Sequence, residues 1–143
     1  MDDPFHLQRF LDAQNSTYTQ ARTELAAGEK RSHWMWFIFP QIQGLGSSSM
    51  AQRYAIADLA EAKAYLAHPV LGERLRECTA LVNAVQDRTL DEIFGYPDDL
   101  KFHSSVTLFA RADASSSLFH AALEKFFQGK EDGGTVRQLG LSR

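Results

Sequence analysis

The chain has one cysteine, no large excess of either charge and no long apolar run, and each scarcity excludes a class of protein. Cys78 alone can form neither an intrachain disulfide nor a zinc site of several cysteines. The net charge of −3 argues against general nucleic-acid binding, which usually needs a basic surface. The longest apolar run, Trp34–Phe39, is far shorter than the roughly 20 residues that span a membrane. We therefore expect neither a nucleic-acid nor a membrane partner.

The five histidines show no metal-binding spacing such as HExxH, so we expect no metal site and no cofactor. The opening residues, MDDPFHLQRF, lack the basic and apolar regions of a secretory signal, which predicts a cytoplasmic protein. A length of 143 residues fits one domain, 1–143, with a hydrophobic core of its own. We expect a monomer or a small homo-oligomer.

Apolar residues recur at helical spacing over 70–86, 99–111 and 118–127. The only strand candidate is 33–39, which as a strand would be buried on both faces and as a helix would be apolar all round. Ser32 as N-cap and Pro40 as terminator favour the helix. The sequence therefore predicts an all-α, compact helical globule of seven to nine helices around a central aromatic helix. Capping-box spacing is found at Thr17/Gln20, Asp58/Glu61, Thr89/Glu92 and Thr135/Gln138.

The first polar cluster opens the segment 30–46, KRSHWMWFIFPQIQGLG, which holds both tryptophans. In the simpler interpretation Ser32 only caps a helix and His33 is a satisfied boundary residue. In the functional interpretation the two preceding cations, the cap hydroxyl and free N–H groups form an anion site. His33 would then act near neutral pH, and the tryptophans would stack on a base or nicotinamide ring. The candidate residues are Lys30, Arg31, Ser32, His33, Trp34 and Trp36.

The second cluster is the loop QIQGLGSSS, residues 41–49. Its two glycines permit positive φ and close backbone approach to a ligand. The loop lacks the lysine of a Walker motif and the third glycine of a dinucleotide fingerprint. A plain capped loop is the simpler interpretation, and a phosphate cradle is the functional one. The candidate residues are Gln41, Gly44, Gly46 and Ser47.

The third cluster is YPDDLKFHSSVTLF, residues 96–109, in which Phe102, Val106 and Phe109 share the core-facing side of a helix. Lys101 and Ser105 share one flanking edge, and His103 lies on the other. A half-buried lysine needs a partner, and Asp98 or Asp99 is the nearest, although Asp98 is also expected to cap the helix. The candidate catalytic residues are Asp98, Asp99, Lys101 and His103, with Ser104 and Ser105 as binding residues.

The segments 30–46, 55–72 and 98–109 resemble the bacterial domain-of-unknown-function family 1810 over nearly the whole chain. This resemblance implies a compact, mainly helical single-domain protein and no established activity. Members of that family are sometimes labelled calpastatin. The label does not suit an acidic globular domain, because calpastatin is a disordered protease inhibitor.

A more distant likeness is to the NADAR family of helical N-glycosidases. The order of features is similar: an aromatic helix ending near Gln41, an alanine-rich helix before His68–Pro69, and Lys101–Phe102 on a later helix. The likeness implies ADP-ribose-type nucleotides as substrates. Because residues 33–36 read HWMW where that family has a glutamate and tyrosine pattern, and its C-terminal Trp-Gly signature is absent, no catalytic residue is carried over.

Together these observations favour a pocket for a phosphate-bearing, nucleotide-like small molecule related to ADP-ribose or NAD, with cleavage of an N-glycosidic bond as its further activity. Asp98 or Asp99 would stabilise an oxocarbenium-like centre or activate water, and Lys101 and His103 would tune charge and protonation. This hypothesis requires a cavity beside Lys101 and a tryptophan that is not enclosed. The alternatives are a non-enzymatic binding or stress-adaptor module and, less favoured without a nucleophile elbow, a hydrolase using Ser104 or Ser105.

Overall fold

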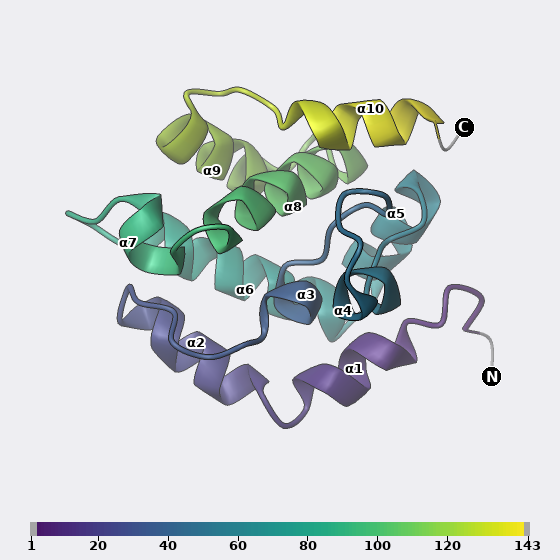
Figure 1. Cartoon of the computed structure of the whole chain (residues 1–143), viewed down its shortest axis with the longest axis horizontal. Coiled ribbons are helices and arrows are strands. Elements are labelled where there is room, and N and C mark those ends of the chain that lie inside the picture. The colour runs from purple at the N-terminus through teal and green to yellow at the C-terminus, as the bar shows by residue number, and fades with distance from the viewer. Residues whose placement is uncertain (1–2, 142–143) are drawn as a thin grey trace.

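A computed structural model describes residues 3–141, which form ten α-helices and no β-strand (Figure 1). Within these residues no helix combines the length and apolarity needed to cross a bilayer. The helices are α1 (Gln8–Gln14), α2 (Tyr18–Ala26), α3 (Met35–Ile38), α4 (Ser49–Arg53), α5 (Leu59–Ala67), α6 (Leu71–Ala84), α7 (Leu90–Phe94), α8 (Asp98–Ala112), α9 (Ser117–Phe127) and α10 (Gly133–Leu141).

The all-α prediction is confirmed, but the described part of the chain holds ten helices rather than seven to nine. The number is larger because short helices form wherever a cap satisfies their first N–H groups. Ser48 accepts a hydrogen bond from the Ala51 N–H and starts α4, and Thr89 forms the predicted capping box with Glu92 at α7. At α2 the box prediction is wrong, because Thr17 makes no side-chain cap hydrogen bond.

The central aromatic helix is shorter than predicted: α3 covers only one turn. Its N-cap is Trp34, not Ser32, and no side chain caps it. The Ser32 hydroxyl instead donates to the Glu24 carboxylate of α2, 2.6 Å away. The Ser32 hydroxyl, which the sequence assigned to the helix start, thus binds Glu24, a residue eight positions earlier in the chain.

The core is built around aromatic rings from four helices and the residues beside them. Phe39 and Phe102 meet edge to face at 5.1 Å between ring centroids, and Phe94 stacks on Phe102 at 5.0 Å. Phe126 and Phe127 contact Phe102 from α9. Figure 1 shows α8 in the middle of the molecule with α9 and α10 above it, and α8 also packs against α5 and α7. The central element is therefore α8.

After α3 the chain runs from Pro40 to Ser48 without a helix and is fixed at one point by an isolated parallel bridge between Ile42 and Ile56. The Ile56 N–H donates to the Gln41 carbonyl and the Gln43 N–H donates to the Ile56 carbonyl, both at 2.8 Å. This bridge ties the loop to the residues after α4, while Gly46 lies against Ala51 of α4 and Gly44 against Gln138 of α10.

Candidate functional site

A cavity of about 490 Å³ lies between the first half of α8, the residues 41–48 loop and the start of α10. We call it the Trp36 pocket. Three segments far apart in the sequence converge on it. The predicted residues that line it are Trp36, Gln41, Gly46, Ser47, Lys101 and Ser104.

The helical period of α8 explains which of its side chains reach the pocket. Leu100, Lys101 and Ser104 lie on one face and line the cavity, while Phe102 is turned into the aromatic core. A cavity therefore lies beside Lys101, which the hypothesis of a binding site required.

Lys101 is the cation of this pocket. Its ammonium lies 5.0 Å from the centroid of the Trp36 ring and 3.5 Å from the Asp98 carboxylate. Trp36 is only partly buried, so its ring forms an accessible aromatic wall. A cation over an aromatic face is attracted by the ring quadrupole, which helps to hold the lysine at this position.

Asp98 joins Lys101 to a second lysine. Its other oxygen lies 2.8 Å from the ammonium of Lys30, whose side chain is 7% exposed and stands 5.0 Å from the Trp34 ring. The prediction that Asp98 caps α8 is wrong, because the N-cap is Pro97 and makes no side-chain hydrogen bond. Two lysines share one carboxylate, so the group of Lys30, Asp98 and Lys101 carries a net charge of about +1 beside the pocket.

The residues 30–34 stretch is fixed by Glu24, a buried carboxylate of α2 that the sequence reasoning missed. Glu24 accepts hydrogen bonds from the Arg31 N–H at 2.8 Å, from the N–H and hydroxyl of Ser32, and from the Trp34 indole at 2.9 Å. Burial by itself raises the pKa of this carboxyl, but these donors stabilise the anion and lower the pKa to about 2. The sequence could have indicated a buried Glu24, because this glutamate shares one face of its helix with Ala21 and Leu25.

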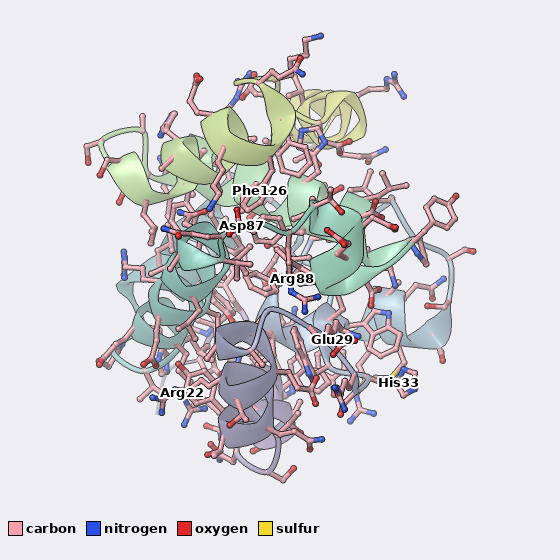
Figure 2. All side chains as sticks on the ribbon, turned by 90° about the vertical axis from the view of Figure 1, so that its left-hand side faces the viewer. Arg22, Glu29, His33, Asp87, Arg88 and Phe126 are labelled. Atoms are coloured by element: carbon pink, nitrogen blue, oxygen red, sulfur yellow. The ribbon has the colours of Figure 1, made fainter. Side chains whose placement is uncertain are left out.

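This network separates most of the first cluster from the pocket. Trp34 is fully enclosed in the core, and the Arg31 guanidinium turns outward to Glu29. His33 is exposed and lies at the edge of the molecule in Figure 2. Of the two tryptophans, only Trp36 lines the cavity.

The other catalytic candidates on α8 point elsewhere. His103 stacks on the Phe127 ring at 3.8 Å, and its Nε2 lies 2.8 Å from the Lys130 carbonyl, toward the loop between α9 and α10. An Asp99 oxygen accepts from the Leu100 N–H, and Asp99 does not line the pocket. Among the four predicted catalytic residues, Lys101 alone reaches the cavity wall.

The carboxylate on the pocket wall is Asp132, which the sequence reasoning did not select. One of its oxygens accepts from the Ser104 hydroxyl at 3.0 Å and from the N–H and hydroxyl of Thr135 at 3.0 and 2.6 Å. Asp132 thus holds the first turn of α10 in place of the box predicted at Thr135/Gln138. The position of Asp132, three residues before Thr135, could have predicted that it caps this helix.

The two serines of α8 differ in position. The Ser104 hydroxyl hydrogen-bonds to the Leu100 carbonyl and to Asp132, and it makes no hydrogen bond to a histidine of the described part of the chain. Ser105 is fully buried, lies outside the pocket lining, and its hydroxyl has no hydrogen-bond partner among residues 3–141. A nucleophilic serine activated by histidine has no support in this geometry.

The loop glycines are required by close packing. A Cβ on Gly46 would lie 2.8 Å from the Ala51 Cβ of α4, and Gly44 has φ +92° with the Gln138 amide where its Cβ would be. Gly46 therefore brings the loop against α4 at the pocket, whereas Gly44 lies at a neighbouring cavity. Within residues 3–141, no group of three His, Cys, Asp or Glu side chains could hold a metal ion.

Comparison with known proteins gives a family and one close structural relative. The family model described as "Protein of unknown function (DUF1810)" matches residues 4–139. The crystal structure of the conserved hypothetical protein Rv1873 from Mycobacterium tuberculosis is similar, with 57% sequence identity and a TM-score of 0.95. The match covers 96% of this chain and 99% of that one. No curated protein matches.

Proposed function

The chain belongs to the DUF1810 family of proteins of unknown function, and we propose that it binds a phosphate-bearing, nucleotide-like small molecule in the Trp36 pocket. The ligand class is that of ADP-ribose and NAD-related compounds. One observation supports this most directly: the Lys101 ammonium stands over the Trp36 ring, 5.0 Å from its centroid, at the wall of a cavity of about 490 Å³. Ligand pockets commonly have volumes of about 300–1,000 Å³.

The lining residues divide into three kinds of partner. Lys101 and the loop at Gly46 and Ser47 offer a cation, backbone groups and a hydroxyl for phosphate. Trp36 offers an aromatic face for a base, since aromatic rings stack favourably in offset geometry. Asp132 offers carboxylate oxygens that accept hydrogen bonds from ribose hydroxyls.

Hydrolysis of an N-glycosidic bond is the second part of the proposal, and Asp132 favours it. Asp98 is neutralised between two lysines, so Asp132 is the carboxylate placed to stabilise an oxocarbenium-like centre or to activate water. The sequence assigned this role to Asp98 or Asp99, and we assign it instead to Asp132, which lies on the pocket wall. We also propose that the protein is cytoplasmic, as the sequence predicts. A phosphorylated metabolite is a ligand that agrees with this location.

Binding is tested by a thermal-shift titration with ADP-ribose, NAD and AMP. A ligand at about 100 times its dissociation constant adds about 2.7 kcal/mol to the unfolding free energy, enough to raise the midpoint by several degrees. We expect this shift in the wild type and in Lys63→Met, an exposed lysine of α5, but not in Lys101→Met. Equal shifts in both variants, or none in the wild type, would contradict the proposal.

Hydrolysis is tested separately by following release of nicotinamide from NAD and of the base from AMP by chromatography. We expect Asp132→Asn to retain binding and lose turnover, because the amide keeps an oxygen acceptor but not the negative charge. Binding without any turnover by the wild type would instead support the non-enzymatic binding module.

A further inference from the structure

A second cavity, of about 350 Å³, lies directly beside the Trp36 pocket along the residues 41–46 segment. Gln41, Gly46 and Ala51 line both cavities. We call the second one the amide cavity, because four glutamines line it: Gln41, Gln43, Gln52 and Gln138.

The chemistry of the amide cavity differs from that of the Trp36 pocket. Its lining residues are glutamine, glycine, alanine and isoleucine, so none of them carries a charge. A glutamine side chain offers both a carbonyl acceptor and two N–H donors. Such a wall suits an uncharged group that carries hydroxyls or an amide, and it provides no cation to compensate a second phosphate.

The two cavities are close enough for one ligand to occupy both. On α10, Gly134 lines the Trp36 pocket and Gln138 lines the amide cavity. Four residues of α-helix correspond to about 6 Å at a rise of about 1.5 Å per residue. The absence of a side chain at Gly44 lets the Gln138 amide approach the loop, since a Cβ there would lie 2.6 Å from its Oε1. This contact brings the amide of α10 to the cavity wall.

We infer that this chain selects two-part ligands in which phosphate joins a nucleoside to a second uncharged, hydroxyl- or amide-bearing group. The inference rests on the proposed function. The nucleoside and phosphate occupy the Trp36 pocket, and the second group occupies the amide cavity. ADP-ribose, in which a diphosphate joins adenosine to an uncharged ribose, belongs to this class, whereas AMP, a mononucleotide, leaves the amide cavity empty.

The test is calorimetric titration of AMP and ADP-ribose. We expect wild type to bind ADP-ribose about tenfold more tightly than AMP, which corresponds to about 1.4 kcal/mol. In Gln43→Leu/Gln138→Leu this ratio should fall close to one, with AMP affinity changed less than twofold. Ala55→Leu, which narrows only the amide cavity, should also lower the ratio. It tests the same inference if the double variant fails to fold. Gln86→Leu, at an exposed residue that lines neither cavity, should keep the wild-type ratio.

The two proposals fail in different ways. Equal wild-type affinities for AMP and ADP-ribose, or a preference kept in both amide-cavity variants, would overturn the two-part ligand while leaving nucleotide binding intact. Absence of binding by either compound would overturn the proposed function and this inference with it.

Discussion

Glu24 is a buried carboxylate that accepts four hydrogen bonds from residues 31–34. Those donors replace the water that an exposed carboxylate would bind, so the anion is stabilised inside the fold. Because the segment leads directly into α3, the ionised state of Glu24 also fixes where Trp34 and Trp36 point. One is anchored in the core by its indole N–H, and the other is left beside Lys101.

The pKa of Glu24 makes the stability of the protein depend on pH. Its folded-state value of about 2 lies below the ordinary value of 4.5, so its contribution is complete above about pH 4.5 and is lost as the pH falls toward 2. We expect the unfolding free energy of wild type to fall, between pH 6 and pH 3, by about 2 kcal/mol more than that of Glu24→Gln. Urea denaturation at the two pH values measures this difference.

The matched control is Glu29→Gln, an exposed carboxylate paired with the exposed Arg31 guanidinium. Surface ion pairs contribute about 0–1 kcal/mol, so this variant should keep the wild-type pH dependence. At pH 7 we expect Glu24→Gln to lose about 2–3 kcal/mol of stability, since hydrogen bonds to a charged group are lost. Identical pH profiles for wild type and Glu24→Gln would contradict the role assigned to the carboxylate.

The two tryptophans should differ in what their removal costs. Trp34 is fully buried, so Trp34→Ala should lower the unfolding free energy by about 3–5 kcal/mol. Trp36 is partly exposed at the pocket, so Trp36→Ala should cost about 1–2 kcal/mol less than that. If a nucleotide stacks on Trp36, we expect it to quench tryptophan fluorescence in the wild type and not in this variant. Urea denaturation followed by circular dichroism compares the two, and equal losses would show that the structural distinction between them is not real.

This distinction could not be predicted from the sequence. Both tryptophans lie in an apolar segment that forms only one helical turn, too short for periodicity to assign a buried and an open side. The polar face of α8 was more predictable, because Lys101 and Ser104 lie beside core phenylalanines at regular helical spacing. The pairing of Asp98 with Lys101 was predicted from their closeness in sequence, but its pairing with Lys30 was not, since Lys30 is far away in the chain and such pairs leave no local pattern.

At the scale of elements, the residues 41–48 loop and α4 meet through Gly46. Since a Cβ there would lie 2.8 Å from the Ala51 Cβ, Gly46→Ala must move the loop away from α4. We expect it to cost about 1–3 kcal/mol of stability, as overpacking does, and to weaken nucleotide binding because both residues line the Trp36 pocket.

The control for this prediction is Gly133→Ala at the start of α10, where a Cβ would meet no atom within 4 Å. Alanine lowers the entropy of the unfolded chain, so this variant should be unchanged or about 0.4–1 kcal/mol more stable. Denaturation midpoints and the binding titration on both variants decide the matter. A Gly46→Ala protein that binds like wild type would show that the loop can move without reshaping the pocket.

The helices themselves illustrate what local signals determine. The box at Thr89/Glu92 is formed as the sequence predicts, because both of its hydrogen bonds lie within four residues. The start of α3 is not, because the Ser32 hydroxyl, which would have accepted from the first N–H groups of a helix, instead donates to Glu24 and accepts from the Gln20 amide. Local patterns therefore gave the helices and many of their starts, and packing between helices decided the remainder.

At the scale of the whole molecule, the Trp36 pocket exists only because α3, the loop after it, α8 and the start of α10 come together. The sequence placed candidate residues in three clusters but held no signal for which clusters meet. In the fold, residues of the second and third clusters line the pocket together; of the first cluster, Trp36 lines it and Lys30 pairs with Asp98 beside it. Convergence depends on the aromatic contacts at the centre, where Phe39, Phe94 and Phe102 link the end of α3, α7 and α8.

These shared contacts predict that the chain unfolds as one cooperative unit. Phe102 alone contacts rings from α7, α9 and the segment after α3, so none of these elements can leave the core without exposing it. At about 0.7 kcal/mol per residue, the 143 residues should give an unfolding enthalpy near 60 °C of about 100 kcal/mol. Calorimetry should find this value equal to the van't Hoff enthalpy, with coincident transitions by circular dichroism and tryptophan fluorescence. Two separate transitions would instead mean that part of the wall of the Trp36 pocket folds independently, and ligand binding would then have to stabilise only one of them.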